Sequence, residues 1–117
     1  MSPLTITARE AATGPVLEIT GDLDHTTAPQ LRKAMDHLPL AAGQLLVLDL
    51  GGLEFCDSSG ITALLATRNL AIEQSGDIAL AAVPANTARI LALVGLDRVF
   101  TIHPDTSTAT APRCATS

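Results

Sequence analysis

The stretch "LLVLDLGGLEFCDSSG", residues 45–60, joins the most apolar run of the chain to a compact group of polar residues. Residues 45–50 are almost all apolar, as expected of a central strand that is buried on both faces. An aspartate, two serines and a glycine follow at positions 57–60. Such a group is compatible with a nucleophile, a phosphate-binding turn, a modification site or the start of a helix. The rest of the sequence is needed to distinguish these.

Four further segments have the pattern of a strand. Residues 4–10 and 15–20 alternate apolar and polar side chains around a turn, which predicts a hairpin. Residues 77–83 form a second buried strand, and residues 98–102 form a last one. Together with the run at 44–50, five strands are predicted.

Three segments carry apolar side chains at the spacing of a helix face. They are residues 26–38, 58–75 and 84–94. The side chains that we expect these helices to bury are Leu31, Ala34, Met35, Leu38, Ile61, Leu64, Leu65, Ile72, Ile90, Leu91 and Val94. Gly76 is predicted to end the second helix, and Gly95 is predicted to take the left-handed conformation after the third.

The element order ββαβαβαβ predicts an α/β fold. Strands that alternate with helices need crossover connections and give a largely parallel sheet, to which the hairpin adds an antiparallel element. We therefore expect one domain over residues 4–103, with a mixed, mostly parallel sheet of about five strands. Residues 104–117 are predicted to be a flexible tail.

Composition limits the possible functions. The 117 residues include two Phe and no Trp or Tyr, so the core has to be aliphatic. The net charge is −5 and the only adjacent basic residues are Arg32 and Lys33, so no nucleic-acid partner is expected. Cys56 and Cys114 match no metal-ligand spacing. Without a signal-peptide pattern or an apolar run of membrane-spanning length, we expect a cytoplasmic chain with no membrane partner.

The segment "DLDHT", residues 22–26, allows an enzymatic interpretation. It resembles the D-x-D-x-T signature of haloacid-dehalogenase-type phosphotransferases, in which the first aspartate, here Asp22, is the nucleophile beside Mg²⁺. Those enzymes need a later lysine and further acids. The single lysine, Lys33, falls on the first predicted helix, and no second acidic pair follows a later strand. The alternative is a turn whose aspartates cap that helix.

The "DSSG" group fits other catalytic patterns poorly. The nucleophile elbow G-x-S-x-G has its first glycine where Cys56 stands here. A P-loop needs the spacing G-x-x-x-x-G-K, which is absent. A simpler interpretation is a helix start in which Asp57 caps the free amides, with Ser58 and Ser59 in the first turn.

Several motifs, taken at their spacing, resemble the STAS domain of bacterial anti-sigma factor antagonists. They are "GDLD" at 21–24, "TAPQL" at 27–31, "LEFCDSSG" at 53–60 and "VGLDRVF" at 94–100. The resemblance covers roughly residues 4–103 and has the element order expected of that family. It implies a regulatory protein and not an enzyme, with no cofactor of its own.

The resemblance also implies a mechanism. The unphosphorylated antagonist binds an anti-sigma factor that is an ATP-dependent serine kinase, and so frees the sigma factor. Phosphorylation of the serine after the motif aspartate, here Ser58, releases the partner, and a serine phosphatase reverses the change. The partner-facing residues implied for this chain are Asp22, Asp24, His25, Thr26, Asp57, Ser58, Ser59 and Gly60.

The chain departs from the family pattern in two places. Residues 104–117 are a poor match to the amphipathic helix that often closes the family fold. Cys56 stands where an apolar residue such as Met is usual, and we interpret it as a small buried hydrophobic residue. The alternatives left open are a STAS interaction module without the phosphorylation cycle and a small Asp22-dependent phosphohydrolase.

Overall fold

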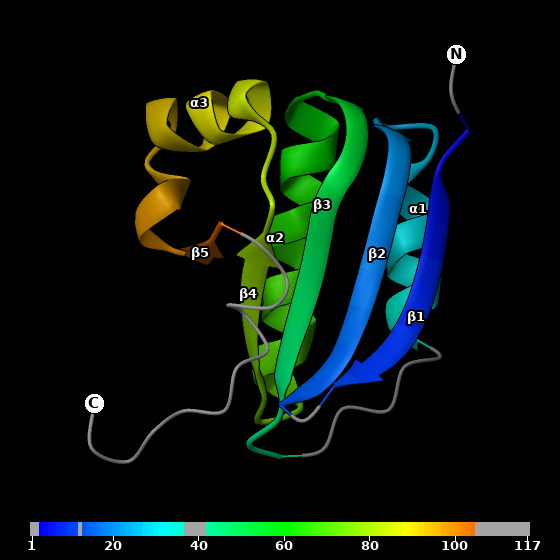
Figure 1. Cartoon of the computed structure of the whole chain (residues 1–117), viewed down its shortest axis with the longest axis vertical. Coiled ribbons are helices and arrows are strands. Elements are labelled where there is room, and N and C mark those ends of the chain that lie inside the picture. The colour runs from blue at the N-terminus through cyan, green and yellow to red at the C-terminus, as the bar shows by residue number, and fades with distance from the viewer. Residues whose placement is uncertain (1–2, 12, 37–41, 105–117) are drawn as a thin grey trace.

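Five strands form one sheet in the computed structural model, which describes residues 3–11, 13–36 and 42–104. The elements are β1 (Thr5–Ala11), β2 (Gly14–Leu23), α1 (Ala28–Asp36), β3 (Leu45–Cys56), α2 (Ser58–Glu73), β4 (Asp77–Ala81), α3 (Ala85–Leu93), the 3₁₀ helix η1 (Leu96–Arg98) and β5 (Thr101–His103). The strand order is β1-β2-β3-β4-β5, with β1 antiparallel to β2 and the other neighbours parallel. The predicted fold class and element order are confirmed (Figure 1).

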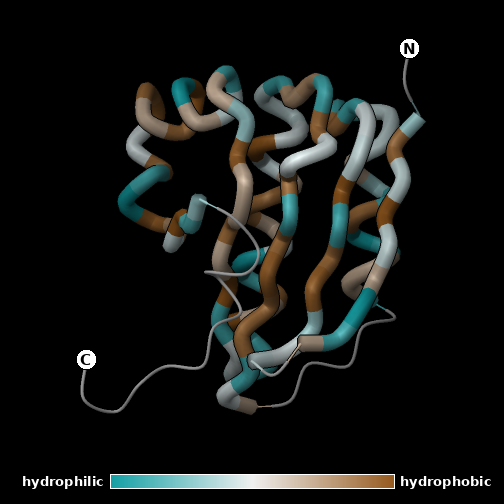
Figure 2. The backbone as a smooth tube through the Cα atoms, viewed as in Figure 1, coloured by the Kyte–Doolittle hydropathy of each residue, from teal (hydrophilic) through white to brown (hydrophobic). Residues whose placement is uncertain are grey.

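Helices α1 and α2 lie together on one face of the sheet (Figure 1). The main core lies between them and the sheet, and its largest fully buried side chains are all aliphatic apart from Met35. On β3, Leu46, Leu48 and Leu50 belong to this core. Val47 instead belongs to a small second cluster with Val16 and Ala81. The central part of β3 is therefore buried on both faces, as predicted, and Figure 2 shows the apolar run along this strand.

The far end of β3 differs from the prediction. The sequence predicts a strand at 44–50 followed by a polar loop, whereas β3 continues to Cys56. Its pairing with β2 shifts twice, between Glu18 and Thr20 and again between Gly21 and Asp22. Each shift places an additional residue on β3, which is how a β-bulge keeps a strand paired while bending it. Strand β3 therefore stays paired with β2 as far as Cys56, at the end of the sheet.

Strand β2 is also longer than predicted. The segment "GDLDH" is predicted to be a turn, but β2 runs to Leu23 and the turn begins at Asp24. Gly21 is buried within the strand at φ +97°, and a Cβ there would lie 2.1 Å from the backbone oxygen of Pro3. Only glycine fits this conformation and this space.

Helix α2 differs from its prediction in two respects. The left-handed residue after α2 is Ser75, at φ +63°, and not Gly76. Ile72 is 45% exposed, because the buried line of α2 runs through Ile61, Leu64, Thr67 and Ala71.

The segment from α3 to β5 shows two further differences. Gly95 takes the predicted left-handed conformation at φ +79°, but Val94 is 58% exposed because α3 ends at Leu93. The last strand covers Thr101–His103, and part of the predicted strand at 98–102 falls in η1.

Some predictions fall outside the described residues. These are the last part of the first predicted helix, with Leu38, and the tail from residue 105 onward, with Cys114. Within the ranges that the structure does describe, no helix has both the length and the apolar character needed to cross a membrane.

Candidate functional site

The two polar segments singled out in the sequence meet at one end of the sheet. Parallel pairing places Asp22 beside Phe55 and Leu23 beside Cys56, at the carboxyl ends of β2 and β3. The Asp57 amide also donates a long hydrogen bond, 3.4 Å, to the carbonyl of Leu23. Carboxyl ends of parallel strands are where α/β folds collect functional loops. The sequence predicted both segments, and the structure brings them together.

Asp57 caps α2, as predicted. Its backbone is extended, at φ −101° and ψ −170°, and its carboxylate accepts a hydrogen bond of 3.0 Å from the Gly60 amide. Its carbonyl accepts the first helical bond, from the amide of Ile61, at 3.0 Å. This carboxylate satisfies one of the amides that every helix start leaves without a partner. The orientation of the first turn of α2 is therefore fixed.

Gly60 fixes the position of the same turn. The residue is buried, and a Cβ on it would lie 2.5 Å from the carbonyl oxygen of Leu23 and 2.7 Å from the Cys56 sulfur. The first of these neighbours is backbone at the end of β2 and cannot move aside easily. The glycine thus lets α2 begin in direct contact with both strand ends.

Ser58 is exposed on the outside of this turn, whereas Ser59 is half-buried. The Ser58 carbonyl accepts a hydrogen bond of 2.9 Å from the hydroxyl of Thr62. Within the described ranges, no histidine forms a hydrogen bond with either serine hydroxyl. The arrangement leaves Ser58 accessible to an external group.

The loop between β2 and α1 is held by its own side chains. The Asp24 carboxylate accepts hydrogen bonds from the amides of Thr26 at 2.9 Å and Thr27 at 3.1 Å. The Thr27 hydroxyl donates to the carbonyl of Asp22 at 2.8 Å and accepts from the Asp24 amide at 2.9 Å. Asp24 therefore shapes the turn as well as adding charge, while His25 and Thr26 are exposed at its tip.

Two contributors to this site were not predicted as site residues. Thr27 was not predicted to hold this loop, and the bonds that it makes depend on how the loop folds back. Phe55 is 52% exposed beside Asp22, although it follows a buried strand. Strict alternation from Leu53 would turn Phe55 toward the core, and the bulge in β3 reverses this. The sequence carries no visible signal for that bulge.

Cys56 is buried, and its thiol stays protonated at neutral pH. Burial, and to a smaller extent the neighbouring Asp57 carboxylate, raises the pKa of its thiol from an ordinary 9.0 to about 11. The thiolate is the reactive form of cysteine, so this thiol is protected from oxidation and from metal binding at neutral pH. The interpretation of Cys56 as a small buried hydrophobic residue is confirmed.

The charge of the site is acidic. Asp22, Asp24 and Asp57 all lie at this end of the sheet, in a chain with a net charge of −5. Across residues 3–11, 13–36 and 42–104, no three His, Cys, Asp or Glu side chains gather closely enough to hold a metal ion. The surface is thus suited to contact with basic groups of another molecule.

The sheet with one antiparallel edge strand, helices α1 and α2 on one face and the capped "DSSG" turn define a small α/β domain of the STAS type. The family model described as "Mlab, STAS domain" matches residues 6–103. The chain belongs to this family.

Named relatives support the same assignment. The anti-sigma-F factor antagonist RsfB of Mycobacterium tuberculosis is 34% identical over 97 residues, which are 83% of this chain and 79% of the relative. The anti-sigma F factor antagonist of Paenibacillus polymyxa is 30% identical over 89 residues, 75% of this chain and 76% of the relative. The crystal structure of an anti-sigma factor antagonist from Mycobacterium paratuberculosis superposes with a TM-score of 0.74. It is 30% identical, and the match covers 92% of this chain and 93% of that one.

Proposed function

We propose that this chain is an anti-sigma factor antagonist whose partner affinity is controlled by phosphorylation of Ser58. In this proposal the unphosphorylated form binds an anti-sigma factor with serine-kinase activity. The kinase transfers phosphate to Ser58, the partner is released, and a serine phosphatase restores the binding form. The names of the relatives support the general role. The observation that carries the specific role is the exposed Ser58 hydroxyl at the fixed start of α2.

The docking surface that we propose consists of the carboxyl ends of β2 and β3 with the turns that follow them. It comprises Asp22, Asp24, His25, Thr26, Phe55, Asp57, Ser58 and Ser59, with buried Gly60 holding the turn in place. Its acids would attract basic side chains of the partner, and Phe55 offers an apolar anchor of the kind that dominates the free energy of interfaces. The same surface would present Ser58 to the active site of the kinase.

Phosphorylation would leave the fold intact and weaken the interface. A phosphate adds about −1.5 to −2 charges at neutral pH. The start of a helix favours negative charge, so α2 tolerates the group. Asp57 and the nearby acids would repel it, and a docked partner would have to strip it of water. A coupling of about 1–3 kcal/mol is reasonable for such a change, which corresponds to an affinity loss of roughly 5- to 150-fold.

A pull-down from native cells with the tagged chain tests the proposal. We expect mass spectrometry to identify an anti-sigma factor with a kinase domain, bound more weakly by Ser58→Asp than by the native chain. The matched control is Asn86→Asp, because Asn86 is an exposed residue in the first turn of α3. It adds the same charge at the start of another helix, outside the proposed docking surface. Equal binding by the native chain and Ser58→Asp would contradict the release mechanism.

A further inference from the structure

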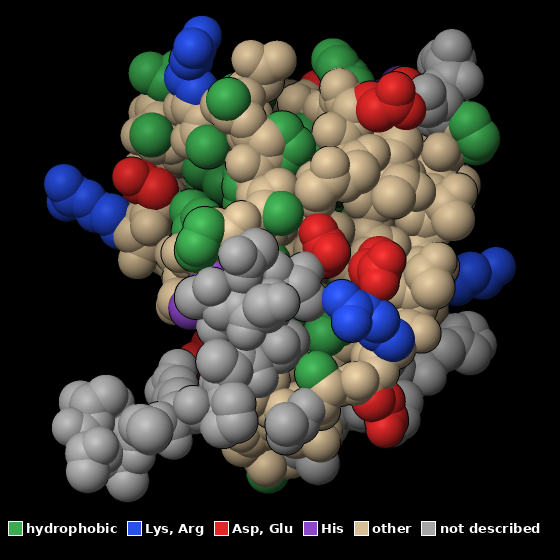
Figure 3. All heavy atoms as spheres, viewed as in Figure 1, with side chains coloured by type: hydrophobic (Ala, Val, Ile, Leu, Met, Phe, Trp, Pro, Cys, Tyr) green, Lys and Arg blue, Asp and Glu red, His purple; other side chains and the backbone are tan. Residues whose placement is uncertain are grey.

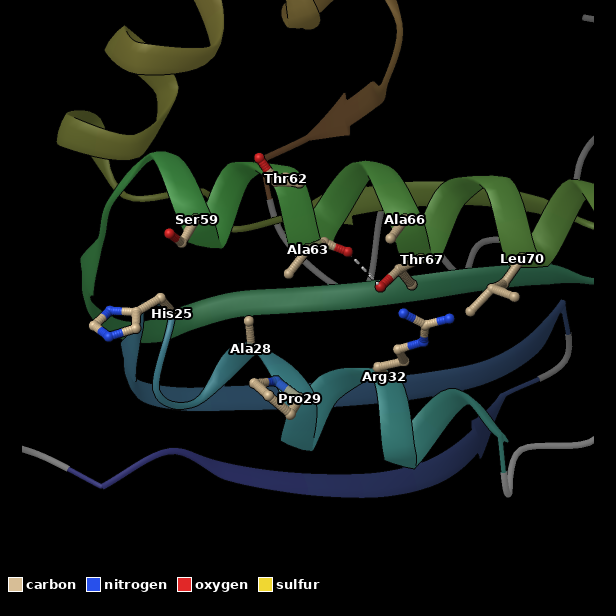
Figure 4. A pocket seen from close by; sticks show the side chains of 10 residues that line it. All are labelled: His25, Ala28, Pro29, Arg32, Ser59, Thr62, Ala63, Ala66, Thr67 and Leu70. Atoms are coloured by element: carbon tan, nitrogen blue, oxygen red, sulfur yellow. Dashed lines mark hydrogen bonds between the residues drawn. The ribbon is translucent and has the colours of Figure 1, made fainter.

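A groove of about 260 Å³ separates α1 from α2 and opens beside Ser59 (Figure 4). Its lining residues are His25, Ala28, Pro29, Arg32, Ser59, Thr62, Ala63, Ala66, Thr67 and Leu70. Four of the lining positions are alanine or proline, namely Ala28 and Pro29 on α1 and Ala63 and Ala66 on α2. The groove thus results directly from the choice of side chains on the facing helix surfaces.

The lining is mostly apolar. Three alanines, Pro29 and Leu70 supply hydrocarbon surface. The Thr67 hydroxyl donates a hydrogen bond of 2.8 Å to the carbonyl of Ala63, so its polar atom already has a partner. The Thr62 hydroxyl is likewise bonded to the Ser58 carbonyl. An apolar group would therefore fit along the middle of the groove without leaving these hydroxyls unpaired.

The charges of the lining are one-sided. None of the lining residues is acidic, although the chain contains 12 Asp and Glu. Figure 4 shows the Arg32 guanidinium reaching across from α1 toward Thr67 and Leu70 on α2, with His25 at the opposite end. In the part of the chain that the structure describes, Arg32 forms no ion pair. Guanidinium pairs with a carboxylate through two parallel hydrogen bonds.

We propose that this groove binds a small amphiphilic carboxylate, with its hydrocarbon part between α1 and α2 and its carboxylate on Arg32. The volume lies just below the range of about 300–1,000 Å³ that is usual for small-molecule pockets, so the ligand is short. The apolar lining selects the hydrocarbon part, and the unpaired cation selects the anionic head. A bound ligand would reach Ser59, the neighbour of Ser58. The proposal does not depend on the anti-sigma factor assignment.

Titration of the isotope-labelled chain with octanoate, followed by amide NMR shifts, tests this site. We expect saturable shifts that centre on residues 28–32 and 59–70. Arg32→Gln should weaken binding by up to about fivefold, since Arg32 is exposed and an ion pair at an exposed site contributes little more than that. Lys33→Gln is the matched control: it removes the same charge from the next residue of α1, which does not line the groove, and should leave the affinity unchanged.

Two further arms separate the contributions of the head and of the hydrocarbon part. Octylammonium, with the opposite charge, should give no saturable shifts. Ala66→Leu should fill the groove and abolish octanoate binding, whereas Ala92→Leu, at an exposed position of α3, should not. Absence of saturable octanoate shifts in the millimolar range overturns the proposal. So does equal binding of octylammonium, or equal weakening by Lys33→Gln and Arg32→Gln, and these arms do not depend on whether Ala66→Leu folds.

Discussion

Helices α2 and α3 occupy equivalent places in the topology but begin in very different ways. Each follows a parallel strand of the sheet, α2 after β3 and α3 after β4. Asp57 caps α2 with a side-chain hydrogen bond, and Gly60 seats its first turn on Leu23 and Cys56. Pro84 precedes α3 and provides no side-chain cap.

Helix α2 is also more deeply buried than α3. The buried residues of α2 extend from Gly60 to Ala71, whereas α3 buries only Thr87 and Leu91. Leu93 at the end of α3 is 79% exposed, and Figure 3 shows hydrophobic side chains at the surface over α3 and η1. The start of α2 is therefore fixed by specific contacts, whereas the start of α3 is a simple connection. Substitutions at Gly60, Cys56 and Asp57 should show how much the contacts at the start of α2 contribute to the free energy of unfolding.

Gly60→Ala should have the largest effect on the free energy of unfolding. The added methyl group would lie 2.5 Å from the Leu23 carbonyl oxygen, which belongs to the backbone. Ala gains about 1 kcal/mol over Gly in a helix, but the overpacking outweighs it, and we expect a net loss of about 2–3 kcal/mol. Urea unfolding followed by circular dichroism measures this.

The control for Gly60→Ala is Gly51→Ala. A Cβ at Gly51 meets only side-chain atoms, at 3.2 and 3.3 Å, and the residue is exposed. We expect a change of less than about 1 kcal/mol there. If Gly51→Ala and Gly60→Ala lower the free energy of unfolding equally, the close contact of α2 with the strand ends does not contribute to stability.

The Cys56 thiol should make stability fall at alkaline pH. Its folded pKa is raised from 9.0 to about 11, so between these values the folded state keeps the proton that the unfolded state has lost. Stability is therefore fully present below pH 9 and decreases as the pH rises toward 11, by about 2 kcal/mol over this window. The chain has one lysine and no tyrosine, so few other groups titrate there.

Cys56→Ala separates this contribution from the rest. In a Cys114→Ser background, the pH dependence of urea unfolding between pH 9 and 11 should be weaker in the Cys56→Ala variant than in the chain that retains Cys56. Native Cys56 should also react slowly with a thiol reagent at neutral pH. Identical pH profiles for the two proteins, or rapid modification of the folded chain, would show that the start of α2 does not shield this residue.

Asp57→Ala should have a smaller effect. It removes the acceptor for the Gly60 amide, and loss of such a cap costs about 1 kcal/mol. Asp57→Asn keeps an acceptor oxygen and should lower the free energy of unfolding by only a few tenths of 1 kcal/mol. A loss of stability in the Asn variant as large as in the Ala variant would identify charge, not capping, as the role of Asp57.

The elements at the centre of the sheet were predictable because their apolar period is simple. Residues 45–50 are continuous and buried on both faces, and the Asp57 cap follows from a local rule about helix starts. The extension of β3 through "GGLEFC" was not predictable, since Gly51 and Gly52 are typical of a turn. The strand continues because Gly52 and the residues after it pair with β2.

The rest of the site escaped prediction for the same reason. The bulge decides that Phe55 is exposed, and the folded loop decides which atoms Thr27 can reach. Both depend on contacts between segments far apart in the sequence. The exposure of Val94 likewise follows from the point at which α3 ends. The sequence pattern includes Val94 in the buried face of this helix, but α3 ends at Leu93.

If the start of α2 presents Ser58 for phosphorylation, phosphosite mapping of the chain isolated from its native cells should detect the modified serine. We expect phosphate on Ser58 in a fraction of the molecules. In a Ser58→Ala strain we expect no phosphate on the neighbouring Ser59, which is half-buried in the groove. Phosphate found only at other positions, or transferred by the partner kinase to the Ser58→Ala chain, would contradict the account.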